Sequence, residues 1–200
     1  LQRDVIAATG DTLRLSQVSM ACDFEVALNR DDAQFLGAAS AALELISRIE
    51  DQITLYRETS ELIELNRQAA EAPVRVEARL FDLLRQSLQY ADETESAFHP
   101  AAGALVQLWR DCRAAGRIPE ADEIRDCLQH LQPDAIELDE KTESVRFCHP
   151  GMEINLNAIG KGWAIDRAAE VMQAQGVRDW MMHAGQSSLR SCGSHAGTPG

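Results

Sequence analysis

The spacing of apolar residues changes along this chain, and the change restricts the folds that it can adopt. Residues 12–28 alternate loosely between apolar and polar side chains, which predicts two strands or a hairpin. Residues 35–53 carry apolar side chains at every third or fourth position, which predicts a helix capped by Asp31 or Asp32. A strand pair followed by a long helix favours an α+β fold over a regular series of βαβ units.

Further segments keep this mixture of helices and strands. We predict helices at 61–65 with Ser60 as N-cap, at about 79–94, at 101–115, at 120–131 and at about 161–175. We predict short strands at 74–76, 135–138, 144–147, 154–156 and 180–183, and a loop at 193–200. The sequence contains no internal repeat or low-complexity linker, so we expect a single domain over residues 1–200, in which a mixed sheet packs with helices.

Composition argues against a nucleic-acid partner, a transmembrane segment and a cysteine-based site. The formal net charge of −13 repels phosphate backbones, so we expect no nucleic-acid partner. No run of 18 apolar residues is present, so we expect no transmembrane segment. The cysteines follow no disulfide spacing, and Cys127 with His130 has the spacing of only half a zinc site. We therefore expect the cysteines to be buried free thiols, at positions 22, 112, 127, 148 and 192.

A lysine between two glycines is the most specific local feature. Gly160, Lys161 and Gly162 stand where we predict a helix to begin. Glycines at a helix start let backbone amides approach an anion closely, and Lys161 adds a positive charge there, which suits a pyrophosphate. The segment is not a Walker P-loop, because no serine or threonine follows the lysine. On these residues alone, a surface lysine in a glycine turn is the competing interpretation.

Two other segments place unusual residues just before predicted helices. Tyr56 precedes the helix that Ser60 opens, so its ring could lie against an aromatic ligand or simply seal an edge of the core. Pro100 suits the first position of the helix predicted at 101–115, and His99 stands before it as a hydrogen-bond acceptor.

Four segments, in this order and spacing, resemble the ApbE-like family of FAD:protein FMN transferases. The first is Met20-Ala21-Cys22, which we predict to lie in a strand and where the family often has Met-Gly-Thr. The others are residues 55–66, residues 96–105 with Leu108-Trp109 after them, and residues 154–166. Residues 183–188 are a fifth and weaker match. The resemblance covers about residues 18–193 and implies a T-fold-like α+β architecture.

The resemblance also implies a ligand, a metal and a reaction. FAD would be bound by Met20, Tyr56, Ala97, Phe98, His99, Asn155 and Lys161. Ala158 aligns with a family position that offers its backbone oxygen to Mg²⁺. The family moves FMN from FAD onto a threonine or serine of a target flavoprotein, in a magnesium-dependent reaction. The resemblance assigns no catalytic base to this chain.

Three of the departures from the family pattern change the chemistry expected at the ligand site. His99 stands where the family has aspartate, and a neutral histidine can cap a helix but supplies no permanent negative charge. Asn155 replaces a residue that is often acidic. Gln186 occupies the second of two glycine positions, where its side chain could crowd a bound ligand or its backbone could require a positive φ. These departures leave open an alternative, a non-catalytic FAD-binding protein of the same fold.

Family members generally continue for about a hundred residues beyond the last matching segment. That continuation carries a histidine-containing stretch and further magnesium ligands, so we expect this chain to be incomplete at its C-terminus. Family members usually act at the outer face of a bacterial cytoplasmic membrane, which makes the resemblance point to a periplasmic or membrane-associated protein. The first residues show no signal-peptide pattern, so the sequence does not fix the location.

Overall fold

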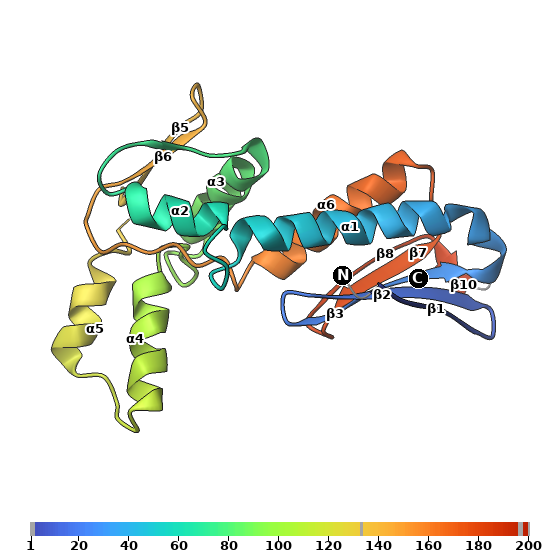
Figure 1. Cartoon of the computed structure of the whole chain (residues 1–200), viewed down its shortest axis with the longest axis horizontal. Coiled ribbons are helices and arrows are strands. Elements are labelled where there is room, and N and C mark those ends of the chain that lie inside the picture. The colour runs from blue at the N-terminus through green and yellow to red at the C-terminus, as the bar shows by residue number, and fades with distance from the viewer. Residues whose placement is uncertain (1–2, 133, 196–197, 200) are drawn as a thin grey trace. The chain divides into compact units, whose positions relative to one another are not determined.

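The computed structural model describes residues 3–132, 134–195 and 198–199, and these form two compact units (Figure 1). Unit 1 comprises residues 1–51 and 159–200, and unit 2 comprises residues 52–158. Each unit has its own buried apolar residues and its own sheet. A single domain over residues 1–200 therefore stays a prediction.

Unit 1 is built on a five-stranded sheet in the order β1-β2-β3-β7-β8, and every neighbouring pair is antiparallel. The strands are β1 (Arg3–Thr9), β2 (Thr12–Ser19), β3 (Cys22–Asn29), β7 (Trp180–Ala184) and β8 (Ser188–Cys192). The predicted hairpin at 12–28 and the strand at 180–183 are confirmed. Apolar alternation does not predict β1, whose pairing with β2 is interrupted by a register shift between Asp4 and Ala7.

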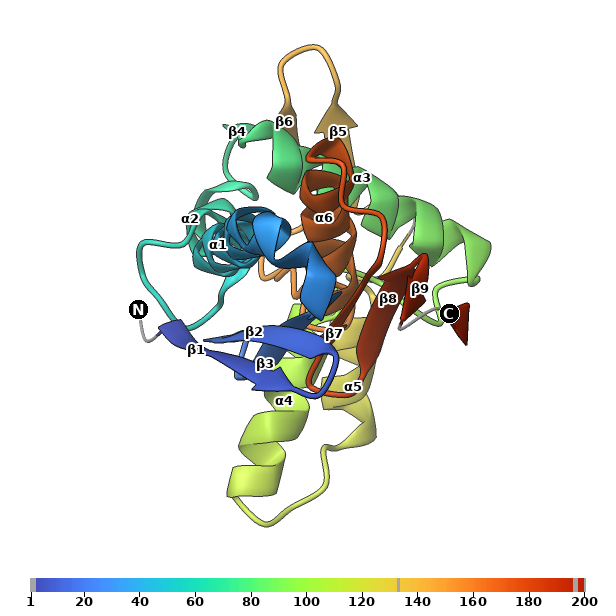
Figure 2. The ribbon, with the colours of Figure 1, turned by 90° about the vertical axis from the view of Figure 1, so that its right-hand side faces the viewer.

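Helices cover one face of this sheet. After the 3₁₀ helix η1 (Arg30–Phe35), α1 (Leu36–Ile53) and α6 (Gly160–Ala174) lie on the same side of the strands (Figures 1 and 2). Side chains that face them are buried in register across the strands, as in the pairs Val26 with Met182 and Leu28 with Trp180. The predicted caps Asp31 and Asp32 are wrong, because η1 begins at Arg30 and both aspartates lie within its first turn.

In its described residues, 52–132 and 134–158, unit 2 combines four helices with a small antiparallel sheet in the order β4-β6-β5. Its elements are α2 (Glu61–Gln68), β4 (Val74–Arg75), α3 (Ala78–Glu93), α4 (Gly103–Ala114), α5 (Ala121–Leu128), β5 (Ile136–Asp139) and β6 (Ser144–Phe147). All of these were predicted within a few residues, because their apolar residues recur with the helical or the alternating period. The helices and antiparallel sheets of the two units confirm the α+β class.

The extended segment 152–156 is held without a neighbouring strand. The side-chain amide of Asn66 donates to the Ile154 carbonyl at 3.0 Å and accepts from the Ile154 N–H at 2.9 Å. The Asn155 N–H donates to the Pro100 carbonyl, and the Gly103 N–H donates to the Glu153 carbonyl. The predicted strand at 154–156 is therefore wrong in the described structure, because a side chain and the start of α4 take the place of a partner strand.

Three further predictions concern the last residues, the cysteines and membrane-spanning helices. The predicted loop at 193–200 instead contains the paired strands β9 (Ser194–His195) and β10 (Thr198–Pro199), while residues 196, 197 and 200 lie outside the described residues. The cysteines are free in the described structure, but Cys148 and Cys192 are exposed, so burial is confirmed only for Cys112. Within the described ranges, no helix has the length and apolar character needed to cross a bilayer.

We predict that Gly103→Ala destabilises the protein. A Cβ at position 103 would lie 2.8 Å from the Glu153 carbonyl carbon, which is backbone and cannot turn aside. We expect a loss of about 2–3 kcal/mol in the free energy of unfolding, measured by urea denaturation. Gly37→Ala is the matched control: no atom lies within 4 Å of its Cβ, and alanine should stabilise α1 by about 0.5 kcal/mol. Equal stabilities for the two variants would contradict the packing of 103 against 153.

Candidate functional site

In unit 1, the first candidate residue lies in a tight turn rather than in a strand. Met20 and Ala21 connect β2 to β3 with φ values of 49° and 58°, which is the backbone of a type I′ hairpin turn. The predicted strand position of Met20 is therefore wrong. Both residues adopt a conformation that favours glycine, at a cost of about 1–2 kcal/mol each. Met20 is half-buried, and Ala21 stands where the resembling family has glycine.

A second turn lies against the first at the same end of the sheet. Gly185 donates its N–H to the Asp23 carbonyl at 3.0 Å, and a Cβ at 185 would lie 2.8 Å from the Cβ of Cys22. Gln186 follows with a φ of 62°, so the positive φ expected at this position is confirmed. The Gln186 side chain is exposed. Glycine at 185 is required both by its φ of 51° and by this close approach.

Lys161 lies in the first turn of α6 and acts electrostatically on the thiol of Cys22. Burial raises the pKa of Cys22, and the nearby ammonium of Lys161 opposes that rise. Lys161 is therefore close to the pair of turns that hold Met20 and Gly185. The first N–H groups of a helix have no carbonyl within the helix to bond, so the start of α6 presents amides and an ammonium together.

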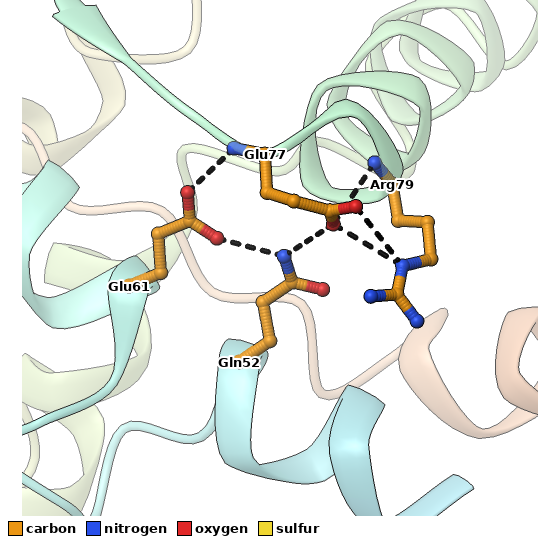
Figure 3. Close-up of polar contacts among 4 residues, drawn as sticks. All are labelled: Gln52, Glu61, Glu77 and Arg79. Atoms are coloured by element: carbon orange, nitrogen blue, oxygen red, sulfur yellow. Dashed lines mark hydrogen bonds and ion pairs between the residues drawn. The ribbon is translucent and has the colours of Figure 1, made fainter. Parts of the chain in front are cut away.

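In unit 2, a polar network fixes the segment that follows α1 (Figure 3). Gln52 donates from its side-chain amide to Glu61 at 2.7 Å and to Glu77 at 2.8 Å, and Glu61 also accepts from the Glu77 N–H at 2.6 Å. Arg79 donates to the Glu77 carboxylate at 3.2 Å. Burial alone would raise the pKa of Glu77, but the hydrogen bonds from Gln52 and Arg79 lower it overall. The starts of α2 and α3 are thus joined to Gln52.

Ser60 occupies the N-cap position of α2, as predicted, but its hydroxyl makes a different bond. The side chain is buried, and its Oγ donates to the Gln52 carbonyl at 2.8 Å instead of capping α2. Its N–H donates to the Arg57 carbonyl. Both bonds close the loop that carries Tyr56.

Tyr56 is 71% exposed, which contradicts the interpretation that it seals an edge of the core. Its N–H donates to the Thr54 hydroxyl oxygen at 3.2 Å. The guanidinium carbon of Arg110, in α4, lies 5.9 Å from the centre of the tyrosine ring, within the range of a cation–π interaction. An aromatic face is therefore presented to solvent beside a cation.

The loop after α3 carries the next three candidates. Ala97 is exposed, and Phe98 is half-buried with its N–H donating to the Thr94 hydroxyl oxygen. His99 is only 6% exposed, and its Nδ1 accepts from the Ala101 N–H at 3.1 Å. The acceptor expected before this turn is confirmed. The predicted helix start at 101 is wrong, because α4 begins at Gly103 and Pro100 lies in the preceding turn.

His99 is held as a neutral side chain. Its Nδ1 is an acceptor, so the proton lies on Nε2, which is buried and has no partner among the described residues. Burial lowers the pKa of His99. The position therefore differs from the family's aspartate in charge as well as in shape.

Asn155 lies near the end of the extended segment 152–156, and Ala158 follows that segment. Both residues belong to unit 2. The side-chain oxygen of Asn155 accepts from the Asn157 N–H at 3.0 Å and so closes a turn before Ala158, which is exposed. Mg²⁺ prefers about six oxygen ligands. Across the described ranges, no three histidine, cysteine or acidic side chains form a metal cluster, so Ala158 and its described surroundings do not by themselves fit this ion.

Two residues of unit 2 were missed by the motif analysis. Arg110 covers Tyr56 and acts electrostatically on Glu153, whose pKa is raised by burial and held back by Arg110. Each is the charged neighbour of a motif, since Arg110 follows Leu108-Trp109 and Glu153 precedes Ile154. That adjacency was the signal available in the sequence.

Comparison with known proteins gives one family. The ApbE family matches residues 20–199. The FAD:protein FMN transferase of Klebsiella pneumoniae is 36% identical over 147 residues, which are 74% of this chain and 46% of that protein. The FAD:protein FMN transferase of Treponema pallidum is 29% identical over 161 residues, which are 78% of this chain and 44% of that protein. The chain spans about half the length of these curated relatives.

Solved structures give the same fold. The ApbE protein of Thermotoga maritima has a TM-score of 0.80 at 24% identity, over 91% of this chain and 59% of that one. The flavin transferase ApbE of Vibrio cholerae has a TM-score of 0.81 at 21% identity, over 94% of this chain and 62% of that one. At these identities the likeness establishes the fold alone, and the predicted ApbE-like architecture is confirmed.

We predict that His99 makes the protein less stable in mild acid. Its folded-state pKa is lower than the ordinary value of about 6.5, so the folded form binds fewer protons than the unfolded form. The stability is present above pH 6.5 and is lost as the pH falls through the lower, folded-state value. His99→Asn keeps an acceptor for the Ala101 N–H but does not titrate, so the fall in melting temperature between pH 7.5 and 5 should be smaller. His149→Asn, at an exposed position, should keep the wild-type pH dependence. Parallel curves for wild type and His99→Asn would refute this role of burial.

Proposed function

The chain belongs to the ApbE family, and from that premise we propose that the protein binds FAD and moves its FMN onto a threonine or serine of a target flavoprotein. The observation that carries the proposal is Lys161 in the first turn of α6, beside the turns at Met20 and Gly185. Such a helix start attracts the charged part of a dinucleotide.

The pyrophosphate bridge of FAD suits the groups that unit 1 presents. The ammonium of Lys161 and the first N–H groups of α6 are charge-matched to a dianionic bridge. The lysine is half-buried, and a partly desolvated ion pair is stronger than one in open water. Met20 is held by its turn near the same place and offers a flexible apolar side chain.

The isoalloxazine end suits the groups that unit 2 presents. Tyr56 offers an exposed aromatic face, and the loop at 97–99 offers the exposed Ala97 and the half-buried Phe98 next to the buried His99. Planar rings stack on aromatic side chains, with a gain beyond the area that they bury. Asn155 keeps the neighbouring extended segment in place through its turn with Asn157.

The proposed reaction is a phosphoryl transfer. The hydroxyl oxygen of the target residue forms a bond to the flavin-side phosphorus, the bond from that phosphorus to the bridging oxygen breaks, and AMP leaves with the bridging oxygen. The hydroxyl proton is released, and negative charge builds on the phosphate oxygens, where Lys161 would stabilise it. Magnesium dependence belongs to this proposal by family, and the Ala158 carbonyl would supply one of the oxygen ligands that the ion needs.

Two departures favour a second candidate, an FAD-binding protein that does not transfer FMN. His99 supplies no negative charge where the family has aspartate, and Gln186 places a side chain on a turn where the family has glycine. Incubation with FAD, Mg²⁺ and a threonine-containing target peptide separates the two candidates. Transfer releases AMP and leaves a fluorescent peptide, whereas binding alone leaves FAD intact.

We predict that Lys161→Ala weakens FAD binding. A charge-assisted hydrogen bond contributes about 1.5–3 kcal/mol, so the dissociation constant should rise by at least about tenfold, as measured by calorimetric titration. Lys141→Ala is the matched control, because Lys141 is the chain's other lysine and lies exposed in the turn between β5 and β6. An unchanged affinity for Lys161→Ala, or no FAD binding by the wild-type protein, would overturn the proposal.

A further inference from the structure

Tyr56 and Arg110 form an exposed pair that adds little to the stability of unit 2. The ring is 71% exposed, and the guanidinium carbon lies 5.9 Å from its centre. A cation–π contact at such an open position is weak, yet the backbone loop that carries Tyr56 is closed by hydrogen bonds. Tyr56 is fixed through the hydrogen bonds of Thr54 and Ser60, which close its loop. A well-positioned pair with little structural benefit suggests a binding role.

The position of Arg110 follows from the start of α4. The Gly103 N–H is bonded to the Glu153 carbonyl at 3.0 Å, and a Cβ at 103 would not fit, so α4 is locked to the extended segment. Arg110 is seven residues further on, which is about two helical turns, or about 10 Å, along the same face. The charge of Arg110 also opposes the rise in the pKa of Glu153 that burial causes. The guanidinium therefore has an aromatic face and a carboxylate in its surroundings.

The chemistry of these groups matches one part of FAD. A guanidinium is planar, stacks on aromatic rings and carries five N–H donors in a fixed arrangement. The isoalloxazine ring is planar and bears two carbonyl oxygens on its pyrimidine edge, which accept hydrogen bonds. A tyrosine face and an arginine edge together provide stacking and donors for such a ring. A guanidinium also suits a phosphate, but the proposed function already places the pyrophosphate of FAD at Lys161, in unit 1.

We propose that Arg110 is a further FAD-binding residue, which donates hydrogen bonds to the pyrimidine-edge carbonyls of an isoalloxazine ring stacked on Tyr56, with Glu153 as its positioning residue. This inference rests on the proposed function and deepens it, because it assigns recognition of the flavin, as distinct from the nucleotide, to unit 2. It also gives the exposed Tyr56 a partner that the family motif does not contain.

The test compares two ligands that share the adenosine and the pyrophosphate. Arg110→Ala should raise the dissociation constant for FAD about tenfold and leave the dissociation constant for ADP unchanged, as measured by calorimetric titration. Arg110→Lys keeps the charge but loses the planar fork, so it should recover only part of the FAD affinity. Glu153→Gln should weaken FAD binding to a smaller extent than Arg110→Ala. Arg113→Ala, at an exposed position in the last turn of the same helix, should bind both ligands as the wild type does.

The outcomes separate this inference from the proposed function. If Lys161→Ala weakens binding of FAD and ADP while Arg110→Ala changes neither, the role of Arg110 is overturned and the proposed function stands. If Arg110→Ala weakens FAD and ADP equally, the guanidinium contacts the nucleotide and the inference also fails. If the wild-type protein binds no FAD, both fall together. Melting temperatures close to that of the wild type are expected for the Arg110 variants, because the residue is exposed.

Discussion

The carboxamide of Asn66 gives Ile154 the two hydrogen bonds that a neighbouring strand would otherwise supply, and the candidate site of unit 2 depends on this pair. Two backbone hydrogen bonds hold the same segment, from the Asn155 N–H to the Pro100 carbonyl and from the Gly103 N–H to the Glu153 carbonyl. Through these contacts it places the turn that holds His99, the start of α4, and the turn before Ala158. Three of the family's segments therefore meet at one short stretch of extended chain.

Charge has to be arranged locally in this protein. A net charge of −13 disfavours the approach of an anionic dinucleotide, so the proposed binding of FAD would depend on a few cations in suitable places. Lys161 is held at the start of α6, where the helix dipole adds to its charge, and Arg110 is held beside Glu153 and Tyr56. The neutral, buried His99 adds no positive charge near neutral pH, because burial lowers its pKa.

Periodicity predicted most of the elements, since α1, α3 and the β2–β3 hairpin bury one regular face. Periodicity failed where buried side chains alternate along a segment that does not pair with a neighbouring strand. Met152, Ile154 and Leu156 alternate as in a strand, but the alternation does not reveal that Asn66 takes the place of a partner strand. The turn at Met20 was misassigned because neither Met20 nor Ala21 is a residue typical of positive φ. Arg110 was missed because its contact with Tyr56 joins residues 54 positions apart, which only the fold brings together.

Amide hydrogen exchange of the wild-type protein tests the central role of Asn66 most directly. If its side chain holds the extended segment as a strand would, the Ile154 and Asn155 amides should exchange only through large unfolding events, as slowly as buried amides of α3. In Asn66→Ala the same two amides should exchange much faster. Exchange of the wild-type Ile154 amide as fast as that of exposed turn residues such as Gln186 would contradict the account.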